Sequence, residues 1–61
     1  MSYSLEEKRK AIEREISLRK RVYPSRVETR RMTEQAANYQ IHIFEEILED
    51  YVKAEHKEQL F

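Results

Sequence analysis

The sequence predicts an all-α protein that folds as an antiparallel helical hairpin. The 61 residues include no glycine and a single proline, Pro24. Charged residues make up 39% of the chain, and most of them are Glu, Lys and Arg, which favour helices. Apolar residues recur at helical spacing in two long segments. These observations predict one domain over residues 1–61, with two long helices and a short helical connector.

The first helix is predicted over residues 5–22. Ser4 and Glu7 have the spacing of a capping box, in which each side chain bonds the other residue's backbone amide. Tyr23 precedes Pro24, and a residue in that position disfavours helical geometry, so we expect the helix to end at Val22. At 100° per residue, two apolar lines run along this helix about 120° apart. The first line is Leu5, Ile12, Ile16 and Tyr23, and the second is Ala11, Leu18 and Val22.

Residues 24–32 are predicted to connect the two helices. Pro24 can begin a helical turn because the first turn needs no amide donor at that position. We expect this turn to reach about Arg30, with a bend before Thr33. The absence of glycine means that no residue here adopts a left-handed helix stop without a steric cost.

The second helix is predicted over residues 34–58, with Thr33 as its N-cap. Its apolar residues cover an arc of about 220°, whereas a surface helix needs a stripe of little more than 100°. One antiparallel helix cannot cover such an arc, so a further helix is required. The members of the arc are Ala36, Ala37, Tyr39, Ile41, Ile43, Phe44, Ile47, Leu48, Tyr51, Val52 and Ala54.

Chain length also favours a partner subunit. Domains this small usually need disulfides, a metal or oligomerisation to be stable, and the chain has no cysteine. We therefore expect a homodimer that forms a four-helix-type bundle, since two-fold dimers are the commonest oligomers. The residues expected in the core and dimer interface are Ile12, Ile16, Tyr39, Ile43, Phe44, Ile47, Leu48 and Tyr51.

Charge is divided unequally between the two halves of a chain whose net charge is zero. Residues 1–32 carry ten basic and five acidic side chains (+5), and residues 33–61 carry two and seven (−5). This division indicates either two helices that attract each other or a basic surface for nucleic acid. The basic residues concerned are Arg19, Lys20, Arg21, Arg26, Arg30 and Arg31. Overall neutrality makes nucleic-acid binding the alternative rather than the main prediction.

No pattern of catalytic residues is present. The chain lacks cysteine and glycine-rich loops, and a single hairpin offers no cleft to shift the pKa values of Glu45, Glu46, Glu49 and Asp50. His42 and His56 lack the spacing of a helical metal site, so we expect neither metal nor cofactor. The N-terminus lacks the apolar core of a signal peptide, and no apolar run is long enough to span a membrane. We expect a cytoplasmic protein that is not an enzyme, with residues 60–61 as a short apolar tail.

Several short elements resemble very small phage and prophage proteins. These elements are Arg21-Val22-Tyr23-Pro24, Arg26-Val27, Arg31-Met32-Thr33, Ala37, Ile41, Phe44-Glu45 and Ile47. Over about residues 16–51 the chain is similar to small early proteins of the exo–xis region of lambda-like phages. It departs from the resemblance at Arg30, where glycine is expected, and at Gln40, where an acid is expected. The resemblance implies a host cytoplasmic location and an accessory role in early infection, in host physiology or in the choice between lysis and lysogeny.

The residues and the resemblance together predict a module that acts through protein–protein interaction, first with a second copy and then with an unknown host protein. The alternative is a small nucleic-acid-binding regulator that uses the basic first helix and connector.

Overall fold

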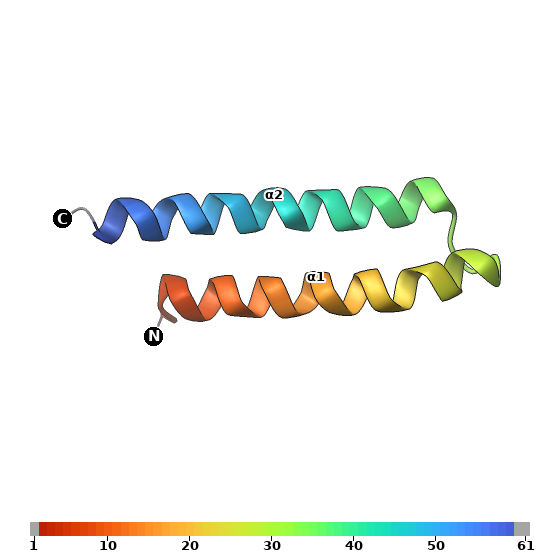
Figure 1. Cartoon of the computed structure of the whole chain (residues 1–61), viewed down its shortest axis with the longest axis horizontal. Coiled ribbons are helices and arrows are strands. Elements are labelled where there is room, and N and C mark those ends of the chain that lie inside the picture. The colour runs from red at the N-terminus through yellow and green to blue at the C-terminus, as the bar shows by residue number, and fades with distance from the viewer. Residues whose placement is uncertain (1, 60–61) are drawn as a thin grey trace.

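The computed structural model describes residues 2–59 and contains two α-helices lying side by side. Helix α1 spans Leu5–Glu28 and helix α2 spans Glu34–Gln59, and the two run antiparallel over most of their length (Figure 1). The molecule is a rod that measures 48 × 19 × 17 Å. The predicted all-α helical hairpin is thus confirmed. Residues 60–61, the predicted apolar tail, lie outside the described part.

Capping side chains fix where both helices begin. The Ser4 hydroxyl accepts the Glu7 amide at 3.1 Å, and the Glu7 carboxylate accepts the Ser4 amide at 3.2 Å. At the start of α2, the Thr33 hydroxyl accepts the Ala36 amide at 3.1 Å. These bonds satisfy amides that have no partner inside the first helical turn.

The sequence predicts that the first helix ends at Val22 and that the connector begins at residue 24, and both predictions are wrong. Instead α1 continues through Pro24 to Glu28. An interior proline costs a helix about 3 kcal/mol, because it removes one hydrogen bond and crowds the preceding turn. Burying a large apolar side chain returns about 1.5–3 kcal/mol. Tyr23 is buried and Val27 half-buried only because the helix continues, and their burial offsets the proline.

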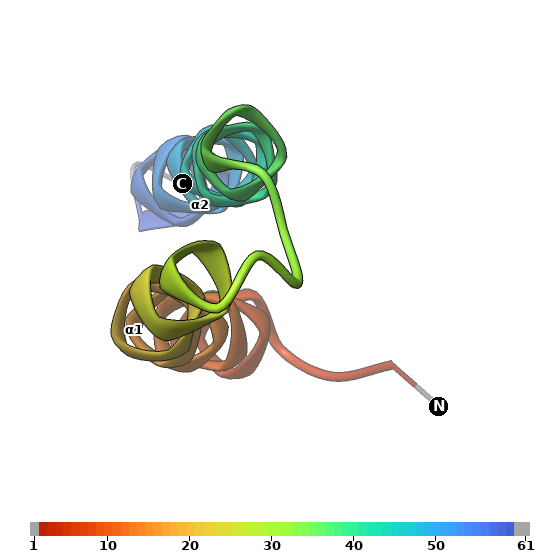
Figure 2. The ribbon, with the colours of Figure 1, turned by 90° about the vertical axis from the view of Figure 1, so that its right-hand side faces the viewer.

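The connector is the short segment from Thr29 to Thr33, and it closes α1 with a Schellman motif. The Arg31 amide donates to the Arg26 carbonyl at 2.9 Å, and the Arg30 amide donates to the Val27 carbonyl at 3.1 Å. Arg30 adopts the left-handed conformation that this motif requires, with φ of 60°. Figure 2, seen from this end, shows the connector passing from α1 to α2 along one side of the hairpin. Arg30 is also the position at which the sequence resemblance expects glycine.

The two helices share one seam, and the buried residues lie along it. Among the described residues, Ile16, Tyr23 and Ala37 are the buried ones, and no side chain is less than 2% exposed. Half-buried side chains line the rest of the seam, Ile12 and Leu48 among them. The hairpin alone therefore has a narrow core.

Replacement of Arg30 by glycine is expected to stabilise the hairpin by about 1 kcal/mol. Glycine removes the cost of a left-handed conformation, about 1–2 kcal/mol, but returns part of it because the unfolded chain becomes more flexible. Urea unfolding followed by circular dichroism, at one protein concentration, measures the change. The matched control is Arg31→Gly, which has no positive φ to relieve and should destabilise. Equal destabilisation by both glycines would contradict the prediction.

Candidate interaction surface

Arg19 lies in the seam between the helices. Its guanidinium carbon is 3.7 Å from the centroid of the Phe44 ring, a cation–π contact. Its Nε donates to the Glu15 carboxylate at 2.8 Å, and its Nη1 donates to Gln40 Oε1 at 3.1 Å. Only 16% of the Arg19 side chain is exposed. Arg19 therefore joins α1 to α2 through both its charge and its flat guanidinium face.

Within residues 2–59, two ion pairs cross between the helices. Lys20 Nζ lies 3.1 Å from the Glu45 carboxylate, and both side chains are substantially exposed. Near the open end of the hairpin, the Arg9 guanidinium donates to Glu55 and also to Glu13. The hydrogen bond that Arg9 donates to Glu55 raises the pKa of Arg9 above its ordinary value. These pairs match the basic character of α1 with the acidic character of α2.

The contacts of Arg19 and Lys20 mark opposite edges of the seam. Consecutive residues of a helix are 100° apart, so the two neighbours project to different sides while both reach α2. Arg19 meets Gln40 at one edge, and Lys20 meets Glu45 at the other. The seam therefore has an Arg19–Gln40 edge and a Lys20–Glu45 edge, and each flank of the hairpin borders one of them.

The flank beside Arg19 and Gln40 is apolar on both helices. Leu18 and Val22 follow Glu15 in steps of three and four residues along α1, and Ile43 and Ile47 follow Gln40 in such steps along α2. Leu18 is 42% exposed and Ile43 36% exposed. We call this flank the apolar side; its apolar members are Ala11, Leu18, Val22, Ala36, Ile43, Ile47 and Ala54, and Asp50, three residues after Ile47, is a charged residue on the same face of α2.

The eight residues predicted for the core and interface fall into two groups. Five of them line the seam of the hairpin itself: Ile12, Ile16, Phe44, Leu48 and Tyr51. Ile43 and Ile47 belong to the apolar side, and Tyr39 lies at its outer rim with 60% of its surface exposed. The wide apolar arc of α2 therefore serves α1 with one part and leaves the other part uncovered.

The six predicted basic residues do not act as one surface. Arg19 is in the seam and Lys20 is paired with Glu45, whereas Arg21, Arg26, Arg30 and Arg31 are exposed. Sequence reasoning assigned Arg19 to the surface because of its charge. Its position carried the opposite signal, since Ile12, Ile16, Arg19 and Tyr23 follow one another in steps of four, three and four residues along the inward line.

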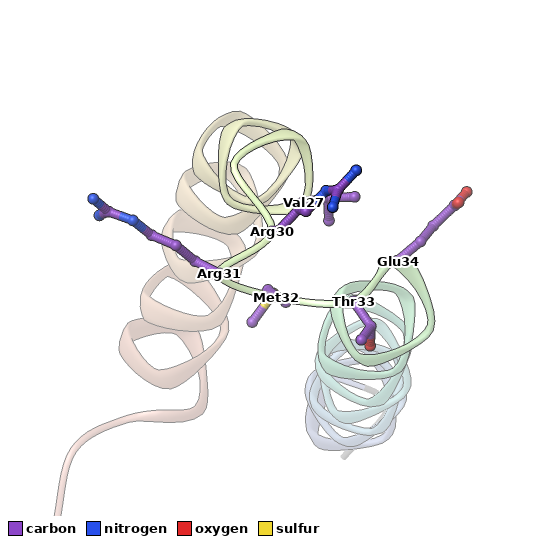
Figure 3. A pocket seen from close by; sticks show the side chains of 6 residues that line it. All are labelled: Val27, Arg30, Arg31, Met32, Thr33 and Glu34. Carbon is purple, nitrogen blue, oxygen red and sulfur yellow. The ribbon is translucent and has the colours of Figure 1, made fainter.

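The hollows of the described surface are open and shallow. One of about 320 Å³ lies at the connector, where Arg30 and Glu34 project to one side and Arg31 points away from them (Figure 3). Another, of about 400 Å³, lies between the helices beside Pro24 and Asn38. Within residues 2–59, no three His, Cys, Asp or Glu side chains are grouped to hold a metal, and no helix is long and apolar enough to cross a membrane.

No family model, curated protein or solved structure matches the chain.

Replacement of Arg19 by alanine is expected to destabilise the hairpin by about 1–3 kcal/mol, because a part-buried, charge-assisted network and a cation–π contact are lost together. Arg19→Lys keeps the charge but not the flat stacking face, so its stability should lie between those of the wild type and Arg19→Ala. Urea unfolding measures the series. Lys10→Ala is the control, since its pair with Glu6 is exposed on both sides. Similar stabilities for Arg19→Ala and Lys10→Ala would refute this role of Arg19.

Proposed function

We propose that this protein is a non-enzymatic interaction module that associates with a second copy of itself through the apolar side. The observation that carries the proposal is the grouping of exposed and half-buried apolar residues from both helices on one flank. Leu18 of α1 and Ile43 of α2 are the largest exposed members. Contiguous apolar patches of this kind mark protein–protein contacts, whereas single exposed apolar residues do not.

The surface area of the chain supports the proposal. A compact folded monomer of 7.5 kDa is expected to expose about 4,250 Å², whereas this hairpin exposes 5344 Å², about 1,100 Å² more. A standard protein interface buries about 800 Å² on each partner. The excess exposed area of the hairpin is thus comparable to the area that one partner buries in a standard interface.

The dimer would act in the manner that the sequence resemblance implies, as an accessory protein of early phage infection in the host cytoplasm. Once the apolar sides are paired, the outward faces of both helices would remain available to a host protein. Binding of nucleic acid remains the alternative, and it would rely on Arg21, Arg26, Arg30 and Arg31. A gel-shift assay at two salt concentrations distinguishes it, since phosphate contacts weaken steeply as salt rises.

Replacement of Ile43 by aspartate is expected to convert a dimer into a monomer. The change places two charges, one per chain, in an apolar interface, where each must lose hydration without gaining a partner. Sedimentation equilibrium measures the association, and circular dichroism on the same samples measures the helix content. The wild type should sediment as a helical dimer at micromolar concentration, and the dissociation constant of Ile43→Asp should rise at least 100-fold.

Val52→Asp is the matched control for this experiment. Val52 is 48% exposed and follows Glu45 by seven residues, which places it on the Lys20–Glu45 edge, so its replacement should leave the dimer intact. A wild type that stays monomeric and fully helical would sink the proposal. Equal weakening of the dimer by the two aspartates would also sink it, because the apolar side would then have no special part in association.

A further inference from the structure

We infer that the two copies pack with their apolar sides face to face about a two-fold axis parallel to the helices, so that α1 of each copy contacts α2 of the other. This inference rests on the proposed self-association and adds the arrangement of the partner. In the resulting four-helix bundle, every neighbouring pair would consist of one α1 and one α2 running antiparallel.

Contacts between α1 and α2 show which residues lie at the same level along the rod. In the four side-chain contacts that join α1 to α2 through Arg9, Arg19 and Lys20, the two residue numbers add to a value between 59 and 65. Arg19 with Gln40 gives the lowest total and Lys20 with Glu45 the highest. A two-fold axis parallel to the helices leaves every residue at its own level. Residues that meet across the dimer should therefore have totals in the same range.

Two outward rows flank the apolar side and satisfy this condition. Each row repeats every seven residues, which keeps its members on one face of a helix in a bundle. The rows are Glu7, Arg14 and Arg21 on α1, and Tyr39, Glu46 and Lys53 on α2. Within one hairpin these rows are on the outer faces and do not meet. Among the described residues, Arg14, Arg21 and Glu46 take part in no ion pair.

Pairing these rows across the proposed axis matches opposite charges. Arg14 would meet the partner's Glu46, and Glu7 would meet the partner's Lys53, both with a total of 60. The third pair would bring Arg21 to the partner's Tyr39, whose exposed ring can accept a cation–π contact. All three pairs are complementary at one common register, and the two-fold axis produces each of them twice.

An axis perpendicular to the helices would place each helix against its own copy. Helix α1 carries eight basic and five acidic residues (+3), and α2 carries two and seven (−5), so both contacts would join helices of like charge. At the level of the rows' midpoints, Arg14 would face the partner's Arg14 and Glu46 the partner's Glu46. Like charges at such positions oppose pairing, which favours the parallel axis.

Cysteine cross-linking distinguishes the two axes, and the chain has no native cysteine to interfere. Leu18 and the partner's Ile43 have a total of 61 and would lie side by side across the proposed interface. Chains carrying Leu18→Cys are mixed with chains carrying Ile43→Cys, and the mixture is oxidised. The cross-linked product is expected to contain one chain of each kind. The Leu18→Cys chain oxidised alone should give no disulfide dimer, because the two α1 helices lie diagonally across the bundle.

Each other result overturns the inference in a recognisable way. A disulfide dimer of Leu18→Cys alone would place α1 against α1 and support the perpendicular axis. A dimer in sedimentation that forms neither cross-link would associate through a different surface. A wild type that sediments as a monomer would remove both this inference and the proposed function, whereas the first two outcomes remove only the arrangement.

A charge exchange tests the rows independently of cysteine chemistry. Arg14→Glu would turn two attractions per dimer into two repulsions and should weaken the dimer about tenfold. Arg14→Glu combined with Glu46→Arg in one chain should restore most of the lost affinity. Under the perpendicular axis, Arg14→Glu alone would keep a like-charge contact and the second change would restore nothing. Absence of restoration therefore overturns the inference.

Discussion

Two helices that lie side by side meet along a single line, and this geometric constraint governs the rest of the structure. Each helix can bury one stripe against its neighbour, and anything wider stays in contact with water. Here the shared line holds Ile16, Tyr23 and Ala37 as its buried residues. Helix α2 has an apolar arc about twice as wide as one stripe. The uncovered part of that arc, together with Leu18 and Val22, becomes the apolar side.

Charge is used differently at the two edges of the seam. At the edge bordered by the apolar side, Arg19 is largely shielded from water and satisfies its donors on Glu15 and Gln40 while it covers Phe44. At the opposite edge, Lys20 and Glu45 form an exposed pair, which contributes little to stability. The shielded arginine thus closes the seam without adding a mobile charge to the surface where association is proposed. The net charge of zero does not reveal this difference between the two edges of the seam.

The helical hairpin and the Ser4 cap could be predicted from the sequence because they depend on local chemistry and on periodicity. The end of α1 could not, since the tertiary burial of Tyr23 and Val27 outweighs the local effect of Pro24. The left-handed conformation of Arg30 could not be predicted from local chemistry, because no glycine marks the turn, although the resemblance expects glycine at that position. For the candidate site, periodicity placed Ile43 and Ile47 in the apolar arc of the second helix. Only the structure shows which part of that arc is covered by α1.

The antiparallel path of the chain has a consequence for how the hairpin folds. Tyr23 and Ala37 lie near the connector and are close in sequence, whereas Arg9 and Glu55, at the open end, are 46 residues apart. Closing a short loop costs less entropy than closing a long one, so pairing of the two helices is favoured from the connector towards the open end. We therefore expect folding to begin at the turn around Arg30. The open end forms last and is the first to fray, and its amides should exchange with solvent fastest.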